Sequence, residues 1–431
     1  MKSRTAIQFK VGGALVIDEV CITDPDPDQV LIKLHATGIC HSQLHQMRDP
    51  KLKRPLVLGH EATGIVEKKG KNVTHVREGD HVVLTWMNPL PAKTKKSDIS
   101  KHFMSPLQTI NKDLVHGVFI YTWGEHVTVR GGYVFPISKD YPTDATSILG
   151  CAVATGCGAV MNTANVLPGN SVAVFGAGGV GLSAICAASI LGAYPIIAVD
   201  LHDKKLVFAK EFGATHLINS KKVNTVEAIL DISSGGVDYA FDAIGVKATA
   251  EQLLSVTKEG GVGVKNDGGT AILIGYPPPE ITIDPSHFVY YQRKYRGSNG
   301  AADPKKDFPK ILNWYKEGKF PLDKLVSNRY KLENINQAYH ELEAGEILGR
   351  GIIEFGSLET DFRQASTLFY LFTLCFQIRR PYGRASRRGV ATNPQPTIPR
   401  PRIHCPPTHD PKTQNSGPWI QHWEPRAQDP G

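Results

Sequence analysis

The chain contains a strand that runs into a glycine-rich turn and continues directly into a helix, and this feature constrains its fold most. Residues 171–175 have the apolar pattern of a buried strand, and Gly-Ala-Gly-Gly-Val-Gly follows at residues 176–181. In such a motif Gly176 allows the tight turn, Gly178 lets the backbone approach a pyrophosphate, and Gly181 lets the helix pack against the strand. The phosphates then face the positively polarised start of the helix. The motif predicts a dinucleotide-binding site.

The same alternation of strand and helix continues beyond the glycine loop. Further strands are expected at residues 195–200, 237–243 and 271–275. Helices are expected at residues 180–191, 203–212, 224–232 and 249–258. Because strands that alternate with helices form a doubly wound parallel sheet, residues 151–297 are expected to form an α/β domain.

Asp200 indicates which dinucleotide binds. It stands at the end of the second expected strand, 19 residues after Gly181. A carboxylate at this position accepts hydrogen bonds from the adenosine ribose and repels a 2′-phosphate, which favours NAD over NADP. Lys205 lies nearby and weakens this preference without reversing it. The alternative is that Asp200 only caps the next helix.

The segments that flank this domain have a different texture. Residues 1–150 contain short β-type runs, such as residues 30–34 and 80–84, that are broken by Gly, Pro and Asp. This pattern predicts an irregular, mainly β domain. Residues 298–355 are helix-rich and end in a strand-like run at residues 351–355. We expect this last segment to fold back onto the first domain.

Residues 356–431 have a biased composition. Eleven of the 29 prolines lie there, and ten Lys or Arg against five Asp or Glu give this segment +5 of the net charge of +8. Such a segment buries too little apolar surface to offset its ordering entropy, which predicts a disordered tail. Its apolar run at residues 368–378 is about half a membrane span in length, so it is either an interaction helix or, as we favour, an adventitious extension.

The cysteine content favours a reducing compartment. In 431 residues there are seven cysteines, an odd and scattered number that does not indicate a disulfide framework. Residues 1–20 lack the apolar run of a signal peptide, and no segment approaches the ~20 apolar residues of a membrane span. We therefore expect a cytoplasmic protein with no membrane partner.

Three residues that are far apart in the sequence have the chemistry of one metal site. Cys40, His60 and Cys151 are the ligand types that a catalytic zinc takes while its fourth position stays open. Taken singly, a cysteine is more often a small core residue and a histidine more often packs or titrates. Their occurrence together, with a dinucleotide loop 25 residues after Cys151, indicates hydride chemistry.

These motifs resemble the zinc-containing alcohol dehydrogenases of the medium-chain dehydrogenase/reductase superfamily over about residues 5–355. The resemblance rests on Gly-Ile-Cys-His-Ser at residues 38–42, Gly-His-Glu at 59–61, Gly-Cys-Ala-Val-Ala-Thr-Gly at 150–156, the glycine loop, and the ending at 350–355. It implies a GroES-like catalytic domain at residues 1–150, completed by residues 298–355. It also implies a Rossmann domain for NAD and an active site in the cleft between the two.

The resemblance also implies a role for individual residues. Cys40, His60 and Cys151 would hold the zinc, with Glu61 as the neighbouring acid. Ser42 would take the alcohol proton, and His45 would pass it to solvent. The remaining implied contacts are those of His41 and Arg350 with pyrophosphate, of Thr155 and Val180 with nicotinamide, and of Trp86 with a slender substrate.

Two departures from the family pattern affect these expectations. The stretch at residues 88–118, where many members bind a structural zinc through four cysteines, contains no cysteine, so we expect one zinc per chain. Gln43 occupies the position of an aspartate that supports the zinc-bound histidine. It can accept one hydrogen bond but lacks charge, and loss of such support costs about 10- to 100-fold in affinity or activity.

The prediction is therefore a zinc- and NAD-dependent alcohol dehydrogenase acting on a primary or secondary alcohol, as a homodimer or homotetramer. A zinc-free quinone or enone reductase of the same superfamily is one alternative, although it would lack the Cys40, His60 and Cys151 set. A non-enzymatic protein that binds nucleotides or nucleic acid through the basic tail is another. Trp419 and Trp423 alone give weak support for an aromatic platform in such a tail, so we expect no nucleic-acid partner.

Overall fold

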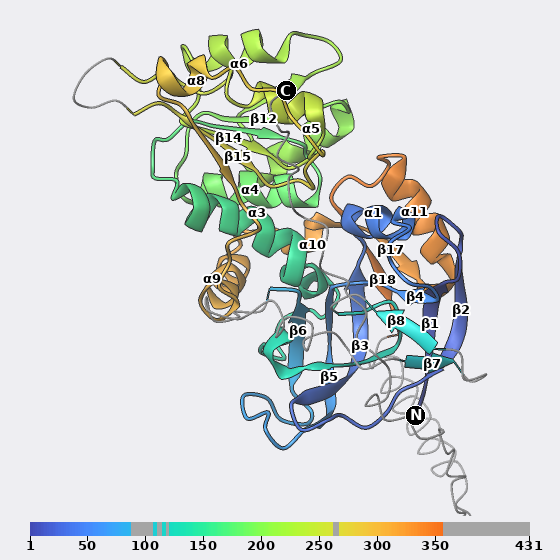
Figure 1. The fold of residues 1–431 in the computed structure, drawn as a ribbon. Helices are drawn as coiled ribbons and strands as arrows, with labels where there is room; N and C mark the ends of the chain where they lie inside the picture. The colour runs from blue at the N-terminus through green and yellow to red at the C-terminus, as the bar shows by residue number, and fades with distance from the viewer. Residues whose placement is uncertain (88–106, 110–113, 118–119, 262–266, 357–431) are drawn as a thin grey trace, which may run out of the picture.

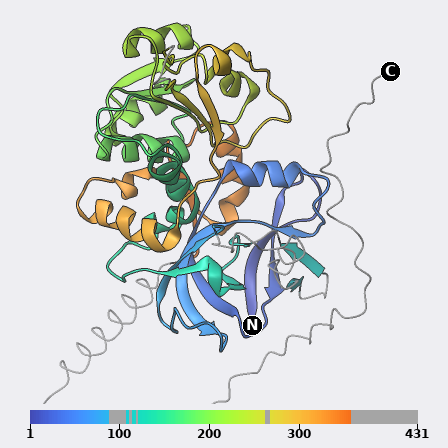
Figure 2. The same ribbon diagram turned by 60° about the vertical axis from the view of Figure 1, so that its left-hand side comes forward.

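The computed structural model describes residues 1–87, 107–109, 114–117, 120–261 and 267–356, which form two bodies that lie against each other (Figure 1). The first and last described segments build one body, and the middle of the chain builds the other, as the turned view also shows (Figure 2). The predicted disordered tail falls outside the described residues, and so does most of the cysteine-free stretch at residues 88–118.

The middle of the chain forms a six-stranded sheet in the order β13-β12-β11-β14-β15-β16, in which every neighbouring pair is parallel. In chain order this is 3-2-1-4-5-6, the order of the Rossmann fold, so the predicted doubly wound sheet is confirmed. The strands are β11 (Val172–Phe175), β12 (Ile196–Asp200), β13 (His216–Asn219), β14 (Tyr239–Asp242), β15 (Thr270–Leu273) and β16 (Lys294–Gly297).

Both faces of this sheet are buried. Val172 and Val174 belong to one apolar cluster, whereas Ala173 and Phe175, which alternate with them, belong to another. Such burial explains why the strands are continuous apolar runs. The accompanying helices are α4 (Gly179–Ile190), α5 (Asp203–Ala209), α6 (Thr225–Ser233), α7 (Lys247–Gln252) and α8 (Ser286–Val289).

The helix predicted at residues 249–258 is wrong over its second half. Helix α7 ends at Gln252, and Thr257 instead forms a parallel bridge with Val237. The backbone N–H of Val237 donates to the carbonyl of Val256, and that of Lys258 donates to the carbonyl of Val237. These non-local bonds satisfy the backbone in an extended form, which suits β-branched Val256 and Thr257 better than a helix.

The other body contains a small barrel and a larger sheet. The barrel joins β1 (Lys2–Gln8), β2 (Leu15–Cys21), β7 (Leu107–Thr109), β8 (Leu114–Gly117) and β4 (Leu56–Val57). The sheet contains β10 (Val134–Pro136), β6 (His81–Thr85), β5 (Glu61–Lys69), β3 (Gln29–Gly38), β18 (Arg350–Glu354), β17 (Val326–Lys331) and β9 (His126–Arg130). The mainly β, GroES-like body expected for the first part of the chain is thereby confirmed.

Strand β3 is the centre of this sheet, since it pairs with β5, β9 and β18. Strand β18 lies antiparallel to β3, so the end of the described chain returns to its first part. The returning segment also contains α9 (Pro304–Lys316), α10 (Leu322–Leu325) and α11 (Ile335–Glu343). Because β3 ends at Gly38, its partners bring distant residues to the start of α1 (His41–Arg48).

One helical run, Ala145–Ala164, is long and apolar enough to cross a membrane, contrary to the expectation that no segment approaches this length. In the structure 89% of its apolar window is buried inside the protein. Its Gly and Ala residues allow this close packing: a side chain at Gly150 would lie only 2.0 Å from the carbonyl oxygen of Leu84. The run is therefore a core helix of the fold.

His35 gives the fold a sensitivity to acid. Its side chain is 8% exposed and its Nε2 atom has no hydrogen-bond partner among the described residues. Desolvation, aided by the charges of His81 and Lys33, lowers its pKa to about 4. A histidine in an unfolded chain has a pKa of about 6.5. Between about pH 6.5 and about pH 4 the unfolded chain therefore binds more protons than the folded chain. The free energy of unfolding thus decreases as the pH falls through this window.

We predict that His35→Phe reduces this loss. Urea denaturation between pH 7 and pH 4 should show a shallower decrease in the free energy of unfolding than in the native protein, by up to about 1.4 kcal/mol per pH unit. His340→Phe, at an exposed position of α11, is the control and should keep the native slope. Equal slopes for His35→Phe and the native protein would contradict the assignment.

Candidate active site

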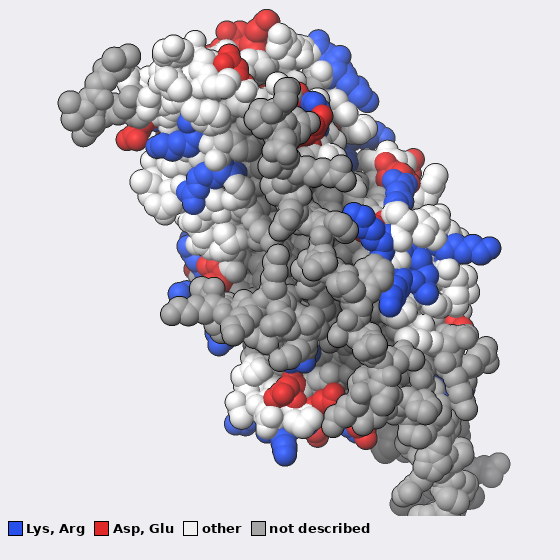
Figure 3. All heavy atoms as spheres, viewed as in Figure 1, with Lys and Arg blue, Asp and Glu red and all other residues white. Residues whose placement is uncertain are grey.

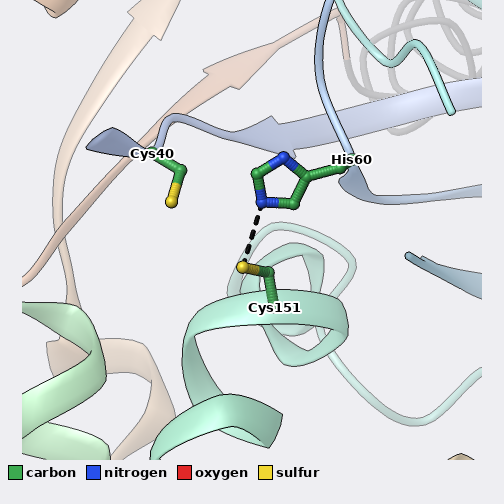
Figure 4. A group of neighbouring side chains, drawn as sticks. All are labelled: Cys40, His60 and Cys151. Atoms are coloured by element: carbon green, nitrogen blue, oxygen red, sulfur yellow. Dashed lines mark hydrogen bonds between the residues drawn. The ribbon is translucent and has the colours of Figure 1, made fainter. Parts of the chain in front are cut away.

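Cys40, His60 and Cys151 converge beside the end of β3, with one potential ligand atom from each lying within 4.8 Å of the others (Figure 4). Cys40 precedes α1, His60 precedes β5, and Cys151 lies in the turn of Leu149–Val153 within the core helix. His60 Nε2 is 3.0 Å from the sulfur of Cys151. Two sulfurs and a ring nitrogen in this arrangement fit a zinc ion with one position left open.

The surroundings favour an ionised thiol at Cys40. Hydrogen bonding to the Cys151 thiol lowers the pKa of Cys40, and the cation of Arg350 acts in the same direction. The thiolate is the form that binds a metal. The pKa of Cys151 is raised, first by its hydrogen bond with Cys40 and then by burial. Cys40 is therefore the more acidic thiol of the two.

Glu61 and Arg350 form a buried ion pair at the base of the site. Glu61 is 0% exposed and Arg350 4%. The guanidinium donates to Glu61 Oε1 from Nε at 3.0 Å and from Nη2 at 2.5 Å, and the backbone N–H of Ala152 donates to Oε2 at 3.1 Å. A side chain at Gly38 would lie 2.3 Å from Glu61 Oε1, so glycine is required there. Burial raises the pKa of Glu61, although Arg350 opposes this.

Gln43 contacts His60 with the opposite end of its amide from the one expected. Its side-chain nitrogen faces His60 Nδ1, while its oxygen accepts hydrogen bonds from the Cys40 backbone N–H at 2.9 Å and from the Tyr339 hydroxyl at 3.1 Å. The acceptor that was expected to support the histidine is thus used by Cys40 and Tyr339 instead of His60. Sequence reasoning missed Tyr339, which lies 296 residues away.

Two hydroxyl groups near the site have no partner. Ser42 Oγ and Thr155 Oγ1 are buried atoms without a hydrogen bond among the described residues. A buried hydroxyl without a partner is unfavourable unless something else binds it. These are the residues expected to face the alcohol and the nicotinamide, so each is available for such a contact.

His45 lies on the exposed side of α1 and stacks on a residue of the other body. Its ring centroid is 4.8 Å from that of Tyr276, with an angle of 16° between the ring planes. Tyr276 follows β15 and is 65% exposed. The predicted outer end of the proton relay therefore lies at the solvent-facing junction of the two bodies. Tyr276 was not expected from the sequence, because its position relative to His45 depends on how the bodies pack.

The glycine loop has the shape that a pyrophosphate requires. Gly176 has a φ of +94°, which few other residues adopt, and a side chain at Gly181 would lie 1.7 Å from the carbonyl oxygen of Gly176. At Gly178, by contrast, a side chain would meet nothing within 4 Å. The space next to Gly178 lies at the start of α4, where an anion is favoured. These residues fit a dinucleotide.

Asp200 ends β12 with its carboxylate beside this loop. Oδ2 accepts a hydrogen bond from the Ala177 backbone N–H at 2.8 Å, and Oδ1 accepts one from the His202 backbone N–H at 3.0 Å. His202 Nδ1 also lies 3.1 Å from Oδ1, whereas Oδ2 has one donor among the described residues and can accept a further hydrogen bond, so ribose contact stays compatible with this position. Lys205 lies on α5, and burial lowers its pKa while Asp200 opposes this effect.

The other predicted cofactor and substrate residues lie on the elements that adjoin the ligand residues and the glycine loop. His41 begins α1 and Val180 lies in the first turn of α4. The guanidinium of Arg350 donates to Glu61. The same side chain also borders the glycine loop, because a Cβ atom at Gly179 would lie 3.2 Å from Arg350 Cδ. Trp86 is partly buried against the apolar cluster shared by the two bodies.

Comparisons with known proteins agree with this arrangement. Two family models match: "Alcohol dehydrogenase GroES-like domain" over residues 26–139 and "Zinc-binding dehydrogenase" over residues 179–317. The chain is 32% identical over 373 residues to S-(hydroxymethyl)glutathione dehydrogenase from Komagataella pastoris, covering 81% of this chain and 96% of that protein. It is also 32% identical over 375 residues to the protein of the same name from Paracoccus denitrificans, covering 80% and 98%.

Solved structures of dehydrogenases also match this chain. An alcohol dehydrogenase zinc-binding domain protein from Burkholderia ambifaria matches with a TM-score of 0.75 and 32% identity, over 83% of this chain and 100% of that one. Benzyl alcohol dehydrogenase from Acinetobacter calcoaceticus matches with a TM-score of 0.73 and 32% identity, over the same 83% and 100%. At this level of identity the similarity extends to sequence as well as fold.

The ion pair at the base of the site generates a stability prediction. Arg350→Met would leave Glu61 buried without its cation, which costs about 3–5 kcal/mol of unfolding free energy. Arg329→Met is the matched control, because Arg329 on neighbouring β17 pairs with Asp144 at 2.7 Å while 41% exposed. An exposed pair contributes at most about 1 kcal/mol. Urea denaturation measures both variants, and equal losses would contradict the role of burial.

Proposed function

This chain belongs to the zinc-containing alcohol dehydrogenases of the medium-chain dehydrogenase/reductase superfamily, and on this premise we propose that it oxidises a slender alcohol with one zinc ion per chain. It is an NAD-dependent oxidoreductase, and its cofactors are zinc and NAD. The observation that carries the proposal is the convergence of Cys40, His60 and Cys151 beside a glycine loop with open space for a pyrophosphate.

The three ligand residues define where the alcohol oxygen would be held. When bound, zinc supplies a Lewis acid that favours loss of the alcohol proton. The Ser42 hydroxyl has no hydrogen-bond partner among the described residues, so it is available to accept this proton. A serine cannot keep the proton, and the exposed ring of His45 on the same helix offers a base that can pass it to solvent. Ser42 and His45 thus form the proposed route to solvent.

The remaining residues orient the cofactor. The backbone of the glycine loop binds the pyrophosphate, and Asp200 accepts hydrogen bonds from the adenosine ribose. Thr155 and Val180 lie on the adjoining helices, which contact each other where Gly156 lies against the carbonyl of Val180. This contact would hold the nicotinamide beside the ligand residues. Hydride transfer then requires only a short distance between the alcohol carbon and the ring.

The substrate we propose is a slender primary or secondary alcohol. Trp86 follows β6 and is partly buried against the core, and the family resemblance implies a position for its ring beside the substrate, so we expect it to narrow the space there. A flat aromatic alcohol suits such a space. Benzyl alcohol is therefore the first compound to test, and S-(hydroxymethyl)glutathione is the bulkier alternative that a related protein's name suggests.

We also propose that the enzyme is a homodimer or homotetramer. Strand β16 is the outer strand of the six-stranded sheet, so one of its edges is available for pairing. Next to it along the chain, Phe288, Val289 and Tyr290 are 40%, 63% and 72% exposed. An open strand edge beside exposed apolar side chains is a typical subunit contact.

A nucleic-acid-binding function has less support. On the part of the face in Figure 3 that is not grey, Lys and Arg side chains gather at the right-hand side next to Asp and Glu side chains, and they form no basic field that runs across both bodies. A protein that binds nucleic acid through its backbone phosphates needs such a field. The basic tail on which this alternative depends lies outside the described residues.

The central prediction concerns metal content and activity together. The purified protein should contain close to one zinc per chain and reduce NAD in the presence of benzyl alcohol. Cys151→Ser should lose both zinc and activity, because a ligand is removed. Cys157→Ser, at a buried cysteine outside the site that donates to the carbonyl of Ser183, should keep both. Activity that survives loss of zinc in Cys151→Ser would favour the zinc-free reductase class.

The proton relay generates a second prediction. His45→Gln should slow alcohol oxidation most at low pH, where hydroxide cannot replace the missing base, while zinc content stays unchanged. His340→Gln is the control, since His340 is an exposed histidine on α11. The measurement is the pH dependence of kcat/KM. An unaltered profile in His45→Gln would show that the proton leaves by another route.

A further inference from the structure

We infer that Gln43 stabilises the metal-free form of the site and so makes this chain bind zinc more weakly than it would with glutamate at position 43. The inference rests on the proposed zinc site and assigns Gln43 a positioning role that acts through His60. It follows from which end of the Gln43 amide faces which neighbour.

The orientation of the Gln43 amide is fixed by the backbone. Gln43 is 0% exposed, and its oxygen accepts from the Cys40 N–H at 2.9 Å and from the Tyr339 hydroxyl at 3.1 Å. A backbone N–H can only donate. If the amide turned over, its NH₂ group would face the Cys40 N–H, and a buried donor would lose its acceptor. The Gln43 oxygen therefore faces the Cys40 N–H, and the Gln43 nitrogen faces His60 Nδ1.

This orientation selects one tautomer of His60. An amide nitrogen is a donor only, so His60 Nδ1, which it contacts, must accept. The ring hydrogen then lies on Nε2, which is 3.0 Å from the Cys151 sulfur and donates to it. Both tautomers of a neutral imidazole carry the same charge, so this selection involves no titration.

Zinc requires the other tautomer. Nε2 is the ring nitrogen that faces the Cys151 sulfur, and it can bind a metal only through its lone pair. The hydrogen must then move to Nδ1, where it would face the donor hydrogens of Gln43. Glutamate has the same shape as glutamine but two acceptor oxygens. One carboxylate oxygen could keep the hydrogen bonds from the Cys40 backbone N–H and the Tyr339 hydroxyl, and the other could accept a hydrogen bond from His60 Nδ1–H.

The expected effect is therefore a gain of metal affinity from a one-atom change. Support of this kind for a metal-bound histidine typically changes metal affinity by about 10- to 100-fold. We predict that Gln43→Glu binds zinc at least about tenfold more tightly than the native chain. Gln46→Glu, on the same helix but without contact to His60 among the described residues, adds the same charge and should leave zinc affinity within about twofold of native.

The experiment titrates the zinc-loaded full chain with a chromophoric chelator and obtains the zinc dissociation constant of each variant. Equal or weaker binding by Gln43→Glu would overturn the inference. Equal gains in Gln43→Glu and Gln46→Glu would also overturn it, because charge alone would then explain the result. If no variant holds zinc, and Cys151→Ser behaves like the native chain, the proposed function itself fails.

A spectroscopic measurement tests the tautomer directly in the native chain and does not depend on Gln43→Glu. In the full chain labelled with ¹⁵N-histidine and stripped of zinc by the chelator, His60 should show a protonated Nε2 and an unprotonated Nδ1. Its signal is assigned by its loss in His60→Asn. A proton on Nδ1 in this zinc-free native chain would overturn the inference even if Gln43→Glu could not be prepared.

Discussion

The ion pair between Glu61 and Arg350 is the contact on which the arrangement of the site depends. Glu61 begins β5 and Arg350 begins β18, and both strands pair with β3, the strand that leads to Cys40. The second carboxylate oxygen holds the Ala152 N–H, next to Cys151. One buried carboxylate thus fixes the spacing of three segments that are distant in sequence. Because Arg350 also borders Gly179, the metal site and the glycine loop share this anchor.

The charges of these groups explain why a buried pair is tolerated at this place. The positive charge of Arg350 cancels the negative charge of Glu61, so the net charge of the site is set by the three ligand residues. Two thiolates and a neutral imidazole match the charge of a divalent cation, so the whole group would be close to neutral with a zinc ion bound.

Local sequence patterns were sufficient for the sheet, the glycine loop and the identity of the convergent residues. They failed where a non-local contact decides the outcome. The bridge between Val237 and Thr257 ends α7 early, although the local pattern favours a longer helix. The direction of the Gln43 amide depends on Tyr339, and the environment of His45 depends on Tyr276. Such choices follow from packing between elements, which periodicity does not encode.

The two bodies meet through a buried apolar base and an exposed rim, and this difference bears on how firmly the site is held. A single apolar cluster contains Ala36 and Val83 of the β body together with Val174 and Leu182 of the Rossmann body. A shared core resists relative rotation because its side chains are close-packed. At the rim, His45 and Tyr276 meet only through exposed rings. The buried contacts at the base therefore fix the spacing of the ligand residues more firmly than the contact at the rim fixes the position of His45.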